Sequence, residues 1–322
     1  DQITMHDDNL GQGLAPGSKY CYRILAEFPL PEGGTSYVSE EKCIIINADA
    51  PVITRVSVMD TDIFEGKVEL SWVPPFEIDT ILFPKPYSYR VNRLEGFSSD
   101  VNLTQSDILL DTFYVDTKVN TLEKVYNYIV EVFSDSDTSS FESSHNASTV
   151  RLELSGKQNS IELNWDFDVP WSNSSSFYPM HYIYRNNVFG SNEDEYILID
   201  SVNVIENGYK YIDTGEFEGI DLDENKIYCY YITTAGTYEN NKLPLNIIYD
   251  DLLLNNSQKI CAQTNDLIPP CPPNEFKISD QYSCEYYFYD KSCDMKDFEN
   301  RIEWNIGEDD CNLDSKLSLI HI

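Results

Sequence analysis

The sequence predicts an all-β protein built from tandem antiparallel β-sandwiches. A Tyr-x-Tyr-x-aliphatic run occurs three times, and its leading tyrosines are Tyr20, Tyr126 and Tyr228. The spacing of about one hundred residues is the length of a domain and not of a solenoid repeat. Short alternating runs are separated by Pro, Gly, Asn and Ser, and no stretch has the periodicity of an amphipathic helix. This pattern is typical of a β-sandwich.

A second repeated strand ends in tryptophan. It reads VELSW, IELNW and RIEW, so that its tryptophans are Trp72, Trp165 and Trp304. Each run alternates apolar and polar residues, the period of a half-buried strand. We therefore expect the three tryptophans to lie in a core strand of successive sandwiches.

The order of the remaining signals is the same in each repeat. After the tryptophan strand comes a YRVNR or HYIYR strand, then VDT at Val115 or IDT at Ile212, and then the tyrosine strand. In sandwiches of this kind, a tyrosine at the start of strand F packs inward while its hydroxyl bonds to the backbone just upstream. This role predicts that the structural corner residues are Tyr20, Tyr126 and Tyr228.

The register of these signals divides the chain into four parts. Residues 1–47 contain the C-terminal part of a first sandwich, 48–147 and 148–266 are complete modules, and 267–322 hold the N-terminal half of a fourth. The segments NADAPVI and DLIPPCPP are expected linkers, because proline stiffens a junction and cannot continue a strand ladder. We expect the chain to be a piece of a longer parent.

The motifs carry two resemblances. A corner leucine followed by Pro-Gly, as in LAPGSKY, resembles the fibronectin type III pattern. The combination of WVPPFEIDT, YRVNRLEG, VPWSN, HYIYR, YCYYITTAGTY and NNSQKICAQ resembles large surface proteins of Bacteroidetes associated with gliding motility. In that family, tandem fibronectin-type modules precede a C-terminal signal read by the type IX secretion system. The resemblance implies a secreted or outer-surface protein without catalytic residues.

The composition restricts the partners. There are 55 acidic and 22 basic residues, a formal net charge of -33, and an isoelectric point of about 4.2. This charge argues against nucleic acid or an anionic membrane as a partner. No apolar stretch is long enough to span a bilayer, so we expect no direct membrane insertion.

Four of the eight cysteines predict two disulfides. Cys21 and Cys229 directly follow the corner tyrosine, and each has one later partner where strand G is expected, Cys43 or Cys261. The middle repeat has Asn127 at this position and no partner cysteine, as a disulfide requires. Since neighbouring tyrosines point inward, the staple should lie on the outer face. Disulfides indicate an oxidising compartment, which is the periplasm, the cell surface or the medium.

The other four cysteines leave their pairing open. They allow three disulfide connectivities or a zinc site, and exported proteins favour disulfides. These residues are Cys271, Cys284, Cys293 and Cys311.

The sequence predicts neither an enzyme nor a cofactor. It lacks a G-x-S-x-G elbow, an H-E-x-x-H motif and a phosphate-binding glycine loop. Its four histidines are scattered, and a structural role on the sheet is the interpretation for His181. Calcium at Asp221, Asp223 and Glu224 is an alternative, since oxygen ligands cluster there.

The loop after the tryptophan strand is long and similar in both complete modules. Its aromatics close one end of the sandwich in one interpretation, and form a repeated binding surface for a glycan or a protein in the other. They are Phe76, Phe83, Trp171 and Phe177. Thr80 in DTI and Ser201 in DSV also resemble O-glycan acceptor motifs of Bacteroidetes, although they read equally well as turn or strand hydroxyls.

Three functions fit these observations. The favoured one is a non-enzymatic extracellular stalk, scaffold or adhesin segment of a large cell-surface protein linked to gliding motility or type IX secretion. The alternatives are an accessory region of a secreted hydrolase and a structural subunit of an outer-membrane assembly. A fold alone does not establish an activity.

Overall fold

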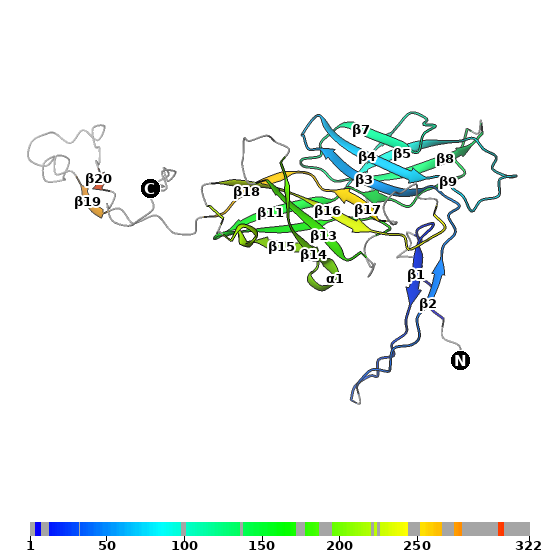
Figure 1. Cartoon of the computed structure of the whole chain (residues 1–322), viewed down its shortest axis with the longest axis horizontal. Helices are drawn as coiled ribbons and strands as arrows, with labels where there is room; N and C mark the ends of the chain where they lie inside the picture. Colours follow the sequence, from blue (N-terminus) through cyan, green and yellow to red (C-terminus); the bar gives the residue numbers. More distant parts are fainter. Residues whose placement is uncertain are drawn as a thin grey trace, which may run out of the picture. The chain divides into compact units, whose positions relative to one another are not determined.

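The computed structural model describes twelve ranges of the chain and divides it into two compact units, Asp1–Asn265 and Asp266–Ile322. Almost all regular elements are antiparallel strands (Figure 1). The described ranges are 4–7, 13–31, 33–97, 101–135, 138–171, 178–186, 195–219, 222–223, 226–243, 252–265, 274–278 and 302–305.

The first β-sandwich combines a three-stranded and a five-stranded sheet of the fibronectin type III-like kind. The smaller sheet has the order β3-β4-β7, and the larger has the order β10-β8-β5-β6 with β9 also paired to β8. Their bounds are β3 (Val52–Asp60), β4 (Gly66–Val73), β5 (Tyr87–Glu95), β6 (Val101–Gln105), β7 (Phe113–Val119), β8 (Tyr126–Ser134), β9 (Glu142–Ser143) and β10 (Ala147–Ser148).

The second β-sandwich repeats this topology. Its sheets have the orders β11-β12-β15 and β14-β13-β16-β17, with β18 also paired to β16. The strands are β11 (Arg151–Lys157), β12 (Ser160–Asp166), β13 (Met180–Asn186), β14 (Ile197–Asn203), β15 (Lys210–Asp213), β16 (Ile227–Gly236), β17 (Leu253–Asn256) and β18 (Ile260–Gln263). Two single-turn helices, α1 (Val204–Asn207) and the 3-10 helix η2 (Glu216–Glu218), lie in its connections.

Alternation along the strands builds the core. In β12, Ile161, Leu163 and Trp165 are buried while the intervening residues are more exposed. Because successive side chains point to opposite faces of a strand, one face of each sheet is apolar and packs on the facing sheet. The predicted all-β, tandem-sandwich fold is confirmed.

The N-terminal residues form a two-stranded ribbon. Strand β1 (Lys19–Tyr22) pairs with β2 (Lys42–Ile45), and the ribbon continues to a bridge between Glu27 and Thr35. It carries several exposed apolar side chains, including Tyr37 at 100 % exposure. From the sequence we expect strands F and G of a first sandwich in this segment. The module boundaries at residues 47, 147 and 266 stay predictions.

The connections between the repeats are buried. In the expected linker NADAPVI, Ala48, Ala50 and Val52 are at most 2 % exposed. Only Thr149 and Val150 separate β10 from β11, and both are buried. Apolar side chains therefore anchor the segment at residues 47–53 in the core, and its role as a linker between modules stays a prediction. The second expected linker lies outside the described residues.

The second unit contains one described strand pair. Strand β19 (Asn274–Ile278) pairs antiparallel with β20 (Ile302–Asn305), with Ile278 opposite Ile302. Trp304 lies in β20, and its side chain is outside the described part. Among the described residues of the whole chain, no helix has the length and apolar character needed to cross a membrane.

Candidate functional site

Each sandwich contains the same bonded group of an arginine, an aspartate and a tyrosine, here called a charge triad. In the first, Arg93 donates to both carboxylate oxygens of Asp116 at 3.0 and 2.8 Å, and Tyr128 donates to the same carboxylate at 3.1 Å. In the second, Arg185 and Tyr230 donate to Asp213 at 2.7 and 2.9 Å. Both charge triads join the two sheets of their sandwich, because the aspartate and its partners lie in different sheets.

The corner tyrosine covers each arginine. The guanidinium of Arg93 lies 5.2 Å from the ring centroid of Tyr126, and that of Arg185 lies 5.4 Å from the centroid of Tyr228. A cation over an aromatic face is attracted by the ring quadrupole. The corner and the charge triad therefore form one structural cluster in each sandwich.

The electrostatics of the charge triads favour a structural role. Burial and the nearby Asp213 carboxylate raise the pKa of Tyr230, and burial together with Asp116 does the same for Tyr128. Both phenols stay protonated and donate at neutral pH, so neither serves as a base. The sequence shows the Arg-containing and Asp-Thr strands as repeats, but it does not reveal that their charged residues pair.

The predicted corner tyrosines bond to backbone N–H groups five or six residues upstream. The hydroxyl of Tyr20 accepts from Ala15 at 2.9 Å, that of Tyr126 from Asn120 at 3.1 Å, and that of Tyr228 from Asp223 at 2.8 Å. The three bonds hold the connection before strand F, because each satisfies a backbone donor of that loop.

The tryptophans of β4 and β12 are buried against different neighbours. Trp72 meets Tyr89 edge to face at 5.4 Å, whereas Trp165 donates its indole N–H to Nδ1 of His181 at 3.0 Å. Burial lowers the pKa of His181 to about 4, against an opposing contribution from the Ala235 backbone. The imidazole is thus neutral and acts as an acceptor inside the core.

The structure forms both predicted disulfides. Cys21 is bonded to Cys43 and Cys229 to Cys261, with Cα–Cα separations of 4.0 and 3.9 Å. Each joins directly opposite residues of an antiparallel strand pair. In the first complete sandwich, Asn127 occupies the corresponding position and donates to the carbonyl of Gly96 at 2.8 Å.

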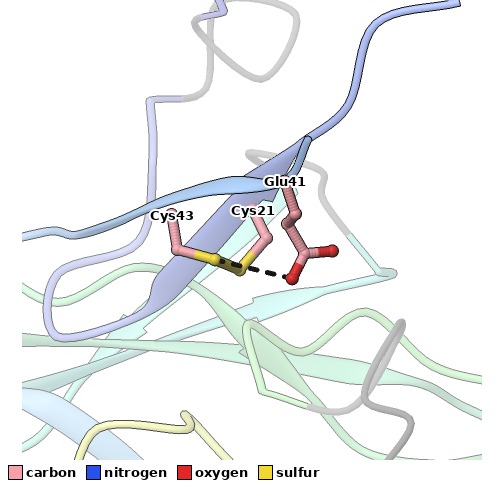
Figure 2. Close-up of side chains that lie close together, drawn as sticks. All are labelled: Cys21, Glu41 and Cys43. Atoms are coloured by element: carbon pink, nitrogen blue, oxygen red, sulfur yellow. Dashed lines mark hydrogen bonds between the residues drawn. A yellow bond between two sulfur atoms is a disulfide. The ribbon is translucent and has the colours of Figure 1, made fainter. Parts of the chain in front are cut away.

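Disulfide formation removes one group of close metal donors. Figure 2 shows Cys21, Glu41 and Cys43 close together. Oε1 of Glu41 lies 3.8 Å from Sγ of Cys43. Because the two sulfurs are bonded to each other, neither is a thiolate that could bind zinc.

The other predicted metal sites lie largely outside the described residues. This holds for Asp221, Glu224 and the cysteines 271, 284, 293 and 311. Asp223 is described and gives its backbone N–H to Tyr228.

The loop aromatics pack inward where they are described. Trp171 is 3 % exposed, with its ring 5.9 Å from Tyr238, and Phe83 stacks on Phe141 at 4.4 Å. Phe76 is half-buried against the core, and Phe177 is outside the described residues. This burial favours self-packing over a binding surface.

The two candidate glycan acceptors differ in accessibility. Thr80 is exposed in a turn that begins at Asp79, whose carboxylate accepts from the N–H of Ile81 at 2.9 Å. Ser201 is half-buried in β14. Modification of either residue stays a prediction.

The two sandwiches are joined along strands β3 and β17, a contact here called the junction. Oδ1 of Asn255 accepts from the N–H of Val56 at 2.7 Å, and Oγ of Ser57 accepts from the N–H of Asn256 at 3.0 Å. The buried hydroxyl of Tyr238 donates to the carbonyl of Ile53 at 2.7 Å. The junction therefore satisfies backbone groups at the edge of each sandwich, which would otherwise be left open.

The N-terminal segment is tied into the junction. Nδ2 of Asn240 donates to the carbonyl of Gly17 at 2.9 Å, and Lys19 pairs with Glu239 at 3.3 Å. Gly17 has a φ of 77°, and an added Cβ would lie 3.3 Å from Val52. Glycine suits this place because the backbone is left-handed and the surroundings are close.

No protein-family model matches the chain, and no curated protein matches its sequence. A solved structure, the crystal structure of the chicken CNTN1 FN1-FN3 domains, is similar with 14 % identity and a TM-score of 0.22. The similarity covers 79 % of this chain and 77 % of that one. The described strands and sheets make this chain a tandem of fibronectin type III-like sandwiches.

Proposed function

We propose that this chain is a non-enzymatic, exported scaffold or adhesion segment, in which the sandwiches act as a spacer that presents neighbouring parts of a larger surface protein. The observation that carries the proposal is the pair of disulfides on repeated positions. Such bonds form and persist in oxidising compartments. A segment that is stapled in two repeats fits the cell surface or the medium.

The junction supports a scaffold role. The two sandwiches have little freedom to move apart. They are linked by only two residues, Thr149 and Val150, and they are hydrogen-bonded through Asn255, Ser57 and Tyr238. Relative domain motion is the usual expectation unless the interface is extensive. A spacer needs this restriction, because it must hold a distance.

The buried ionisable groups support a non-enzymatic role. Arg185, Asp213 and Tyr230 are bonded to one another, and His181 is bonded to Trp165. Among the described residues, no histidine is hydrogen-bonded to a serine or cysteine that could act as a nucleophile. The strongly perturbed groups therefore serve the core.

The finer part of the proposal concerns the parent protein. The motif resemblance supports a large surface protein linked to gliding motility or type IX secretion, with a protein or a surface glycan as partner. The alternatives are an accessory region of a secreted hydrolase and a subunit of an outer-membrane assembly. The domains that accompany this segment in its parent distinguish the three.

Peptide mapping under non-reducing conditions tests the proposal on protein recovered from the native cell surface or medium. We expect Cys21 linked to Cys43 and Cys229 linked to Cys261, and no turnover on polysaccharide or peptide panels. Free thiols at these four positions would remove the argument for export. Turnover that follows this segment through purification would contradict a non-enzymatic role.

A further inference from the structure

A small pocket lies at the junction, between the end of β3 and the outer face of the sheet β14-β13-β16-β17. Its volume is about 210 Å³, and its lining includes Met59 and Thr61 from the first sandwich and Tyr196, Tyr231, Asn256 and Lys259 from the second. Both sandwiches contribute, so the pocket exists only because the junction holds them side by side. We call it the junction pocket.

Three tyrosines in mutual contact make one wall rigid. The rings of Tyr184 and Tyr231 are parallel within 3° at 4.6 Å, and Tyr196 meets Tyr231 edge to face at 5.1 Å. Tyr231 points outward because its neighbours Tyr230 and Ile232 fill the core. Packed tyrosines offer a large apolar surface at a low cost in side-chain entropy.

Polar groups surround this wall. Oγ1 of Thr61 accepts from the N–H of Lys259 at 2.8 Å, which leaves the hydroxyl proton for a further bond. Oδ1 of Asn256 accepts from Thr233 at 2.8 Å, so the amide of Asn256 is oriented and its N–H groups are donors. The ammonium of Lys259 lies 5.0 Å from the ring centroid of Tyr196. The junction pocket thus joins an aromatic wall to fixed donors.

We propose that the junction pocket binds a single neutral sugar ring of a glycan. The C–H face of a pyranose would lie against one of the two tyrosine rings that line the pocket, Tyr231 or Tyr196, and its hydroxyls would bond to Thr61 and Asn256. Pockets for drug-sized ligands have volumes of about 300–1,000 Å³, so a volume of 210 Å³ suits one ring. The net charge of -33 disfavours an anionic polysaccharide at long range.

A peptide is a poorer fit to the same place. An extended peptide gains affinity chiefly by adding to an open sheet edge. The edge strand beside the junction pocket is β17, and its backbone is already engaged with β3 through Ser57. Ring stacking with hydroxyl contacts therefore describes the available chemistry better than strand addition.

The inference deepens the proposed function by naming a ligand class, and it rests on that function only for access to extracellular glycans. Saturation-transfer NMR on the whole chain, with a panel of neutral monosaccharides, tests it. We expect transfer to the ring C–H protons of at least one sugar, with a Kd of the order of 1 mM. No transfer from any sugar would overturn the inference and would leave the scaffold proposal intact.

Three variants locate the binding. Tyr196→Ala and Asn256→Ala should each weaken it at least ten-fold, because one removes ring surface and the other a donor. Tyr37→Ala, at a fully exposed tyrosine of the ribbon, is the matched control and should leave binding unchanged. Circular dichroism verifies that each variant is folded. Unchanged binding in folded Tyr196→Ala and Asn256→Ala would place the sugar elsewhere and overturn the assignment.

Discussion

The two complete sandwiches hold the same charge triad in different surroundings. The Arg93 and Asp116 side chains are 22 % and 8 % exposed, whereas those of Arg185 and Asp213 are 0 % and 1 % exposed. The first pair retains contact with water, and the second depends entirely on its protein partners. An isolated buried charge is far more costly than a hydrated one. Loss of the arginine should therefore lower the free energy of unfolding by different amounts in the two sandwiches.

Two further positions differ between the sandwiches. Where the first has Asn127 bonded to Gly96, the second has the Cys229–Cys261 disulfide. Where the first places Tyr89 beside its core tryptophan, the second places His181. The second sandwich therefore combines a covalent staple with a buried histidine, and we expect this histidine to make its stability depend on pH.

The largest expected effect comes from removing the arginines. Arg185→Met should lower the free energy of unfolding by about 3–5 kcal/mol, because it leaves the Asp213 carboxylate buried without a cation. Arg93→Met should cost less, since water still reaches that pair. Urea denaturation measures both losses.

The double variant Arg185→Met with Asp213→Asn is the control for this comparison. It removes the orphaned charge, and it should recover part of the stability that Arg185→Met loses. Equal losses for the two arginine variants would show that burial does not decide the difference between the sandwiches.

Local patterns explain why much of the fold could be predicted from the sequence. Period-2 alternation marks a strand such as β12. A cysteine directly after the corner tyrosine, as in Tyr228 and Cys229, occurs in two repeats and locates one end of a disulfide. The junction carries no such pattern: Asn255 and Val56 lie 199 positions apart and bond through a single side-chain oxygen. The pairing of Arg185 with Asp213 was equally hidden, because charge attraction has no periodicity along the chain.

The junction pocket was beyond prediction for a related reason. Tyr196 and Tyr231 belong to one module and Met59 to the other, and alternation shows only that Tyr231 points outward. The loop aromatics were visible as a repeat, but repetition does not distinguish a closed end from an exposed surface. The 3 % exposure of Trp171 provides that information.

The second expected effect is a pH dependence that belongs to the second sandwich. The pKa of His181 falls from an ordinary value of 6.5 to about 4 in the folded chain, chiefly through burial. Between these values the unfolded chain binds a proton that the folded chain does not, so stability decreases as the pH falls. The loss should approach about 3 kcal/mol below pH 4.

His181→Asn isolates this contribution. An asparagine Oδ1 can still accept from Trp165 but does not titrate in this range. Unfolding free energies measured from pH 7 to pH 4 should therefore decline less steeply in the variant than in the unchanged protein. Parallel curves would assign the decline to carboxylates and not to His181.

The smallest expected effect concerns the tyrosine corners, which the two sandwiches share. Tyr126→Phe and Tyr228→Phe should each cost about 1–2 kcal/mol, because the backbone N–H of Asn120 or Asp223 loses its acceptor. The ring over the arginine is retained in both variants, so the charge triads should persist. The Tyr228 hydroxyl ties β16 to Asp223 in the connection before it, whereas the Cys229–Cys261 staple ties β16 to β18. Because the two restrain different neighbours of β16, we expect the cost of Tyr228→Phe to be the same in oxidised and reduced protein. Thermal denaturation under both conditions measures it, and a cost that grows on reduction would show that the disulfide compensates for the corner bond.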